Sequence, residues 1–222
     1  MDHAHEPRTH SVIDPAILYW GTPVVLITST NEDGTSNVAP MSSVFWLGQN
    51  CMLGLGSSGK TPQNILRTRQ CVLNLPDDSA FMTTAVNALA CTTGTEIVPL
   101  AKKGRGYIHV KDKWQRAQIT PLKSDLIEPW RVKECPVQME CELVAKHDMF
   151  GNEPGRLGAC IGLEVVVRRV HIRDELRLEG YAARIDPDKW RPMIMSFQQL
   201  YGLRHEKLAQ SVLGKIDEEM YR

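Results

Sequence analysis

The sequence contains no long apolar run, no block of like charge and no signal peptide. No stretch approaches the roughly 20 apolar residues that a membrane-spanning helix needs, and residues 1–6 have neither a basic nor an apolar leader region. Twenty-six basic residues balance 26 acidic ones, which removes the electrostatic case for binding nucleic acid or an anionic membrane. We therefore expect a soluble, cytoplasmic protein whose partners are small molecules or a second copy of the chain.

Paired cysteine motifs are also absent, because no two of the six cysteines form a C-x-x-C pair. Most of them lie in apolar or strand-like runs, where cysteine behaves as a small hydrophobic residue. The seven histidines show no spacing typical of a metal site. We predict free structural thiols and no metal centre. The six cysteines are Cys51, Cys71, Cys91, Cys135, Cys141 and Cys160.

The most informative motif spans residues 54–61, which match the phosphate-loop pattern G-x-x-x-x-G-K-[ST] letter for letter. An apolar run at residues 51–55 precedes the loop, and a short helix is expected over residues 61–69. The loop therefore opens onto a helix N-terminus beside Lys60. This arrangement offers backbone N–H groups and positive charge to a phosphate ester, so the motif predicts a bound phosphate.

The same motif does not indicate a nucleoside triphosphatase. Pro62 occupies a position where such a loop usually offers another backbone N–H, and proline has none. The expected helix is only about two turns long, because an apolar strand begins again at Cys71. No later apolar run is closed by an aspartate that could hold magnesium. We therefore assign the phosphate to a cofactor other than ATP.

The first half of the chain is predicted to form consecutive strands joined by tight turns. Residues 24–30 are rich in β-branched side chains, and residues 31–34 form a turn that contains Asp-Gly. A second strand is expected over residues 36–45, and a further strand over residues 71–75. Connections this short favour an antiparallel meander, because parallel strands need crossovers of a dozen or more residues.

The second half alternates helices and strands around a long insertion. Apolar residues recur at helical spacing over residues 79–90, and residues 91–130 offer little periodicity. The basic cluster at residues 102–106 in this insertion reads as a solvated surface. Residues 137–144 alternate apolar with polar, and residues 161–172 form another long strand.

Two helices are expected at the C-terminal end. Asp186 and Pro187 are typical of a helix start, and that helix is predicted to continue to about Gly202. A last helix over residues 208–220 would carry an apolar stripe that packs on its own barrel or on a partner subunit.

These elements predict a mainly β protein, a small closed or nearly closed barrel with added helices. We divide the chain into a flexible leader at residues 1–14, a barrel domain at residues 15–185 and a C-terminal helical extension at residues 186–222. Pro40 interrupts the second strand, which suggests a sheet edge or a bulge. Such a place leaves backbone groups free to bond a flat heteroaromatic ring.

In this arrangement the chain resembles the flavin reductase-like family of FMN-binding split barrels, which act as homodimers. The resemblance rests on five blocks in the same order and spacing over about fifty residues. It continues more weakly over most of the chain after residue 16. The five blocks are residues 23–29, 33–34 with 37–42, 60–61, 64–65 and 72–75.

The resemblance implies where FMN lies. The isoalloxazine ring would contact the second strand, and the phosphate would lie in the glycine loop. The alternative for each segment is an ordinary edge strand and an ordinary helix start. The ring would be contacted by Asn37, Val38, Ala39, Pro40, Met41, Ser42 and Ser43, and the phosphate by Ser57, Ser58, Lys60, Thr61 and Asn64.

The resemblance also implies a function, in which NADH or NADPH passes a hydride to FMN. The electrons then pass to a free flavin, a partner monooxygenase or a protein acceptor. No side chain is needed as a catalytic acid or base, because the cofactor carries the chemistry. The alternatives are an FMN-binding electron carrier or flavin-storage protein without NAD(P)H activity, and a split-barrel relative that binds haem or pyridoxal phosphate.

One departure from the family concerns the dinucleotide. Members often show a histidine five residues before the glycine of the final long strand, and this chain has Leu157 at that distance from Gly162. The neighbouring Arg156 is a candidate to contact the dinucleotide phosphates, and a solvated loop arginine is the alternative. The sequence leaves open the choice between NADH and NADPH.

Overall fold

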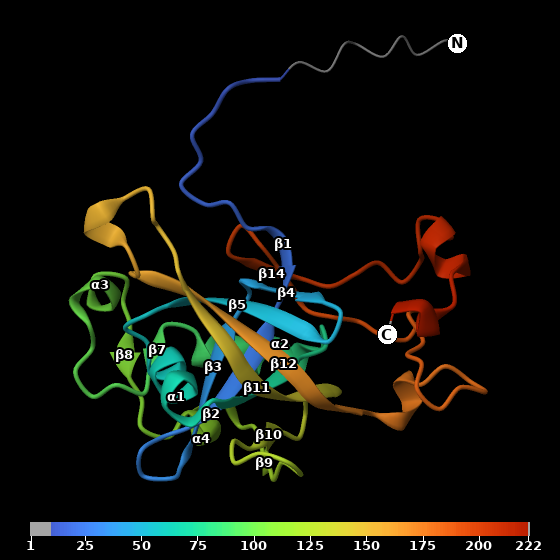
Figure 1. The fold of residues 1–222 in the computed structure, drawn as a ribbon, viewed down its shortest axis with the longest axis horizontal. Helices are drawn as coiled ribbons and strands as arrows, with labels where there is room; N and C mark the ends of the chain where they lie inside the picture. The colour runs from blue at the N-terminus through green and yellow to red at the C-terminus, as the bar shows by residue number, and fades with distance from the viewer. Residues whose placement is uncertain (1–9, 222) are drawn as a thin grey trace.

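The structure, a computed structural model, describes residues 10–221, and its centre is one antiparallel sheet that curls into a barrel (Figure 1). The seven strands lie in the order β3-β2-β6-β11-β12-β5-β4, and every neighbouring pair is antiparallel. The predicted mainly β split-barrel fold class is confirmed. The strands are β2 (Val25–Thr30), β3 (Ser36–Met41), β4 (Val44–Leu47), β5 (Asn50–Gly56), β6 (Gln70–Leu75), β11 (Val137–Asp148) and β12 (Cys160–Ile172).

The barrel is split between β3 and β4. These strands are the two edges of the sheet, yet only Ser42 and Ser43 separate them in the chain. The three Cα–Cα steps from Met41 to Val44 span at most about 11 Å, so the two edges must come together at this point. Pro40 is tolerated in β3 because an edge strand does not need every N–H for its ladder. The single strand expected over residues 36–45 is therefore wrong, since the chain passes from one edge to the other at Ser42.

The core has two parts because strand side chains alternate between the faces of the sheet. In and beside β2, Val25 and Ile27 belong to the apolar cluster inside the barrel, and Val24 and Leu26 belong to a second cluster outside it. The outer cluster is covered by two helices. Each fully buried side chain of this size contributes about 1.5–3 kcal/mol to folding. The covering helices are α2 (Ala80–Leu89) and α4 (Lys113–Ala117).

The remaining short elements surround the barrel. The helix predicted over residues 79–90 is present as α2, and the Ser79 hydroxyl caps it by accepting a hydrogen bond from the Met82 N–H at 3.3 Å. The insertion at residues 91–130 holds only short elements. These and the other additions are α1 (Lys60–Thr68), β7 (Thr92–Thr93), α3 (Leu100–Lys103), β8 (Ile108–His109), β9 (Pro121–Leu122), β10 (Arg131–Val132) and the 3-10 helices η1 (Pro154–Arg156) and η2 (Asp174–Leu176).

The helix predicted to begin at Asp186 is wrong. Asp186 starts a single turn, and Pro192 then prevents the chain from continuing as a helix. The residues that follow form a hairpin that pairs with the first strand, and Met193 is buried where its carbonyl accepts the Val24 N–H at 2.9 Å. The hairpin ties this segment to the barrel. The strands are β1 (Trp20–Pro23), β13 (Ile194–Ser196) and β14 (Gln199–Tyr201).

The last predicted helix is also wrong, because residues 208–220 contain two 3-10 helices, η3 (Val212–Lys215) and η4 (Glu218–Tyr221). The apolar stripe does not pack on the barrel, since Leu208 is 90% exposed and Leu213 is 64% exposed. A short helix without a packed apolar face is marginal in water, and Gly214 lowers its propensity further.

Residues 10–14 of the predicted leader are exposed and have no regular structure, and residues 1–9 lie outside the described residues. Between residues 10 and 221, no helix has the length and apolar character required to cross a bilayer.

Candidate functional site

Gly54 extends the pairing of β5 with β4 to Ser43, at the edge of the split. Its N–H donates to the Ser43 carbonyl at 2.8 Å, and a Cβ on Gly54 would lie only 3.0 Å from the Ser43 Cβ. A larger residue here would push the β3–β4 connection away from β5. The glycine therefore places Ser42 and Ser43 next to the strand that leads into the phosphate loop.

The phosphate loop connects β5 to α1 and is tied to the start of β12. The Ser57 N–H and hydroxyl both donate to the Ala159 carbonyl, at 3.1 and 3.2 Å, and the Gly59 N–H donates to the Gly56 carbonyl at 3.0 Å. Helix α1 begins at Lys60, and no side chain caps it. The first N–H groups of α1 are therefore available to an anion, while Ser57 acts as an anchor of the loop.

Predicted residues from β3 and α1 meet beside this loop. The Asn37 amide donates to the Thr61 hydroxyl at 3.1 Å, and both residues are buried. The Lys60 ammonium pairs with Glu32, and this bond lowers the pKa of the Glu32 carboxyl. Asn37, Lys60 and Thr61 thus lie together at the N-terminus of α1, with the Asn37 amide bonded to Thr61 and the Lys60 ammonium engaged by Glu32.

The Asn64 side chain bonds to the end of β2 and to the turn that follows it. It is fully buried and donates to the Ser29 hydroxyl at 3.2 Å and to the Asn31 side-chain carbonyl at 2.8 Å. The amide thus fastens α1 to the end of β2. Among the other predicted residues, Ser58 is exposed, and Ala39, Pro40, Met41, Ser42 and Ser43 are half-buried along the edge of the split.

Two lysines that the sequence analysis did not include also reach this group. Lys102 Nζ lies 3.2 Å from the position that a Cβ on Gly59 would take. Lys113 is buried, and its ammonium donates to the Val38 carbonyl at 3.1 Å. Burial and the neighbouring positive charge of Lys102 lower the pKa of Lys113 to about 8. Among the described residues, no carboxylate forms an ion pair with either lysine.

One signal in the sequence could have identified Lys113. Asp112 caps α4 by accepting the Gln115 N–H at 2.9 Å, which places Lys113 at the first position of that helix. A positive side chain is disfavoured at a helix N-terminus by the helix dipole. Lys102 offered no such signal, since it lies in a run of basic residues that resembles an ordinary solvated surface.

The segment between α2 and α4 brings Lys102 over the loop. Helices α1 and α3 and strands β7 and β8 lie together on one side of the barrel (Figure 1). A Cβ on Gly94 would lie 3.0 Å from the Asn37 side-chain carbonyl and 3.4 Å from Lys60 Cγ, so the segment crosses close above both residues. The Thr95 hydroxyl beside it is buried without a hydrogen-bond partner in the described chain.

These residues fit the phosphate of FMN. The loop offers uncapped N–H groups, and Lys102 and Lys113 offer positive charge that no carboxylate pairs with in the described chain. A phosphomonoester carries about two negative charges near neutral pH, so two unpaired amines match its charge.

Arg156 does not point freely toward a ligand. Its guanidinium pairs with Glu153 at 2.7 Å and lies 4.2 Å from the centre of the Phe150 ring. All three residues belong to the turn between β11 and β12. The structure therefore shows Arg156 stabilising its own turn, beside Leu157, which is 59% exposed.

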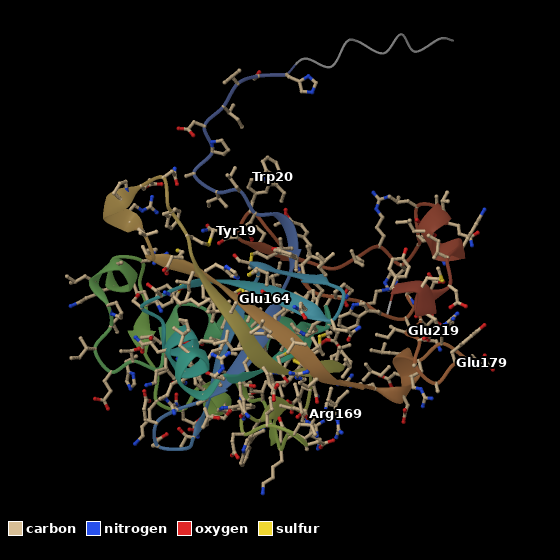
Figure 2. The ribbon with its side chains drawn as sticks, viewed as in Figure 1. Tyr19, Trp20, Glu164, Arg169, Glu179 and Glu219 are labelled. Atoms are coloured by element: carbon tan, nitrogen blue, oxygen red, sulfur yellow. The ribbon has the colours of Figure 1, made fainter. Side chains whose placement is uncertain are left out.

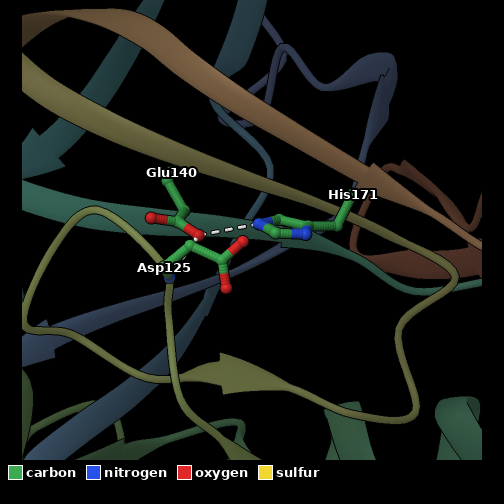
Figure 3. A group of neighbouring side chains, drawn as sticks. All are labelled: Asp125, Glu140 and His171. Carbon is green, nitrogen blue, oxygen red and sulfur yellow. Dashed lines mark hydrogen bonds and ion pairs between the residues drawn. The ribbon is translucent and has the colours of Figure 1, made fainter.

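A separate cluster of Asp125, Glu140 and His171 lies on the sheet (Figure 3). The Glu140 carboxylate is fully buried and accepts the N–H groups of Asp125 and Leu126 at 2.8 and 2.7 Å, and His171 Nε2 lies 2.7 Å from it. Burial acts to raise the pKa of Glu140, but these bonds outweigh it and the pKa lies below its usual value. The bonds from Asp125 and Leu126 to Glu140 hold the loop after β9 in place, and they occupy both oxygens of the Glu140 carboxylate.

Removing the Glu140 carboxylate should therefore destabilise the fold. In Glu140→Ala the N–H groups of Asp125 and Leu126 and the His171 ring lose their common acceptor, and the free energy of unfolding should fall by about 2–4 kcal/mol. Urea denaturation would measure this as a lower midpoint with an unchanged slope. The matched control is Glu142→Ala on the same strand, where the partly exposed carboxylate pairs with Arg168 and the loss should stay below about 1 kcal/mol. Equal losses in both variants would refute the anchoring role.

An antiparallel barrel split between β3 and β4 defines the class of split-barrel folds. Residues 19–178 match the family described as "Flavin reductase like domain". The match covers most of the chain, so the chain belongs to the flavin reductase-like family.

The relatives agree with this assignment. A protein of Bacillus subtilis (strain 168), named uncharacterized protein YdfE, is 35% identical over 201 residues, which are 90% of this chain and 93% of the relative. The flavoredoxin of Desulfovibrio vulgaris (Miyazaki F) has a TM-score of 0.72 at 15% identity, covering 92% of this chain and 98% of that one. Nitrilotriacetate monooxygenase component B from Bacillus cereus has a TM-score of 0.68 at 22% identity, covering 88% and 89%. At these identities the solved structures support the fold.

Proposed function

We propose that this protein is an FMN-dependent oxidoreductase in which NADH or NADPH reduces the flavin. The observation that carries the proposal is the pair of amines, Lys102 and Lys113, that lack a carboxylate partner beside the uncapped start of α1. When bound, FMN would supply the hydride chemistry, while the protein supplies orientation and control of water access.

Different residues around the split would bind the phosphate and the ring of FMN. The first N–H groups of α1, at Lys60 and Thr61, would bond the phosphate, with Lys102 and Lys113 adding charge. Ser57, Ser58 and Asn64 would shape the loop. The edge of β3 and the connection to β4 would face the ring, through Asn37, Val38, Ala39, Pro40, Met41, Ser42 and Ser43.

The electron acceptor would be a free flavin, a partner monooxygenase or a protein acceptor. The names of two structural neighbours support these options, since one is a monooxygenase component and another is a flavoredoxin. The second candidate function is an electron carrier without NAD(P)H activity. It is favoured by Leu157 in place of the family's histidine and by the engagement of Arg156 within its own turn. A cytoplasmic location stays a prediction.

The experiment that tests the proposal is the anaerobic addition of NADH and, separately, NADPH to the FMN-loaded protein while the visible flavin band is recorded. Loss of the band with either dinucleotide supports the reductase. A flavin that dithionite reduces and neither dinucleotide reduces would refute the reductase and favour the electron carrier.

FMN binding should weaken as the pH rises above about 8, because Lys113 has a pKa of about 8. The phosphate favours the protonated amine, so FMN raises the pKa of Lys113. Between the free and bound pKa values the dissociation constant should rise by up to about tenfold per pH unit. Titrations that follow flavin fluorescence from about pH 6.5 to 9.5 would measure this. Riboflavin should show no such slope, and Lys113→Met should remove it for FMN. A slope that survives in Lys113→Met would refute the assignment.

We also propose a homodimer. Apolar side chains are exposed on strands β1 and β4, which contact each other, and Trp20 stands at the outer surface (Figure 2). Trp20 is 69% exposed and Leu47 is 81% exposed, in addition to the stripe around Leu213 and Ile216. Apolar surface of this kind is typical of protein interfaces.

Sedimentation should therefore give a species of about twice the 25.0 kDa chain mass at micromolar concentration. The double variant Leu213→Asp/Ile216→Asp should shift it toward the monomer. The matched control is Ile97→Asp/Leu100→Asp, a change of equal charge at two exposed apolar side chains outside this stripe. A wild-type chain that sediments as a monomer would contradict the homodimer.

A further inference from the structure

The segment at residues 97–111, which we call the basic flap, carries unpaired positive charge. It contains four lysine or arginine residues and no carboxylate, although the whole chain has no net charge. Within residues 10–221, none of the four forms an ion pair. The proposed FMN phosphate accounts for Lys102, and Lys111 is close enough to Asp33 to interact with that carboxyl electrostatically, which leaves Lys103 and Arg105 without an anion.

Arg105 is held in a defined position on this flap. Its Nε–H donates to the Ala101 carbonyl at 3.0 Å, and its guanidinium carbon lies 5.8 Å from the centre of the Tyr107 ring. Lys102 Nζ lies 5.5 Å from the same ring centre. Since Nε is already bonded, the two terminal amino groups of Arg105 remain for a ligand. A planar guanidinium with both terminal groups free matches a phosphate through two parallel hydrogen bonds.

The flap also exposes apolar side chains next to this charge. Ile97 is 85% exposed, Leu100 is 87% exposed and Ile108 is 48% exposed. Leu100 belongs to α3, the helix whose Ala101 carbonyl holds Arg105. A ligand that covers both features would combine a phosphate with a flat apolar ring, as an adenine nucleotide does.

The basic flap lies against the phosphate loop. Lys102 contacts the Gly59 position from the flap side, and Gly94 crosses over Asn37 and Lys60. A nucleotide on Arg105 would therefore be a neighbour of a flavin held by the loop. Arg156, the other candidate for a dinucleotide phosphate, is already engaged by Glu153 and Phe150.

We propose that Arg105, supported by Tyr107, binds the 2′-phosphate of NADPH, with the adenine against Leu100 and Ile97. The site thereby selects NADPH over NADH, which lacks this phosphate. The inference rests on the proposed function, since it names the dinucleotide that the reductase uses. The 2′-phosphate is a monoester with close to two negative charges, so it gains more from a free guanidinium than a pyrophosphate diester does.

The first test measures binding without any reaction. FMN-loaded protein is titrated calorimetrically with 2′,5′-ADP, which carries the 2′-phosphate, and with 5′-AMP, which does not. The wild type should bind 2′,5′-ADP more tightly. Arg105→Ala should weaken 2′,5′-ADP by about tenfold or more and leave 5′-AMP within about twofold, as expected for loss of a charge-assisted hydrogen bond. The affinity of Arg105→Lys for 2′,5′-ADP should be intermediate, because lysine keeps the positive charge but lacks the two parallel N–H donors of the guanidinium.

The matched control is Arg116→Ala. The Nε–H of Arg116 donates to the Ala88 carbonyl at 2.7 Å, so this exposed arginine is held as Arg105 is but lies on α4 outside the flap. It should leave both affinities unchanged. The bound FMN content of each variant shows that it is folded.

The second test uses turnover. Arg105→Ala should raise the KM for NADPH by about tenfold, with kcat retained, and should leave the KM for NADH within about twofold. This inference would be overturned if both dinucleotides reduced the flavin with equal KM values and Arg105→Ala changed neither value. The proposed function would then remain intact. Arg105-dependent binding of 2′,5′-ADP without flavin reduction by either dinucleotide would support the site and refute the reductase.

Discussion

Lys102→Met should weaken FMN binding by about 10- to 100-fold and leave riboflavin binding unchanged. The Lys102 ammonium lies over Gly59 in the loop that we assign to the phosphate, and no carboxylate pairs with it in the described chain. Burial lowers the pKa of Lys102, and Arg105 beside it lowers it further. A phosphate dianion at this place relieves the repulsion between the two cations. Riboflavin has the same ring but no phosphate, so it cannot lose this interaction.

Fluorescence titration of the FMN-free protein with each flavin would measure both affinities. The matched control is Lys103→Met, which removes the same charge from the next residue of α3, where the side chain is exposed. This control should change the FMN affinity by less than about threefold, since an exposed and screened charge contributes little. An equal loss for FMN and riboflavin in Lys102→Met would indicate damage to the fold. Equal affinities of the wild type for the two flavins would refute the phosphate assignment itself.

The barrel was predictable from the sequence because its strands obey a local rule. Val25 and Ile27 face the inside of the barrel, and Leu26 faces the outer helices, as alternation requires. The short connections then fix the antiparallel pairing. The split at Ser42 was harder to predict, since nothing local shows that residues 36–45 change from one sheet edge to the other.

The C-terminal helices were mispredicted because local signals agree with a helix while tertiary contacts do not. Asp186 and Pro187 start a helix and a turn equally well, and Pro192 stops any helix after that turn. Ile194 instead belongs to β13, which pairs with β1. The pairing joins residues about 170 positions apart, which no local pattern reveals.

The candidate site was likewise predictable only in part. The loop at residues 54–61 was visible as a motif, and the structure joins Asn37, Lys60 and Thr61 beside it. Lys102 and Lys113 were missed because they come from an insertion without periodicity. Only the fold brings Lys102 to the loop and Lys113 to the neighbouring strand β3.

Anaerobic NADPH should bleach the flavin band of the FMN-loaded protein within seconds. A nicotinamide stacked on a fixed flavin makes hydride transfer effectively unimolecular, with effective molarities on the order of 10⁵ M or more. The edge of β3 around Met41 and the split at Ser42 would hold the ring for this step. No acid or base from the protein is required, so the rate should depend little on pH between about 6 and 8.

Stopped-flow absorbance with NADPH, NADH and dithionite separates the reductase from the carrier. Gly54→Val provides a structural test, because its side chain would collide with Ser43, whose Cβ lies only 3.0 Å from the Cβ position of Gly54. This variant should slow reduction by NADPH by about tenfold or more through a misplaced ring, while dithionite still reduces the flavin at the wild-type rate. The matched control is Gly151→Val, because a Cβ at Gly151 would contact nothing within 4 Å. A wild-type flavin that accepts electrons from dithionite and from neither dinucleotide over minutes would overturn the reductase, because a correctly stacked nicotinamide cannot be that slow.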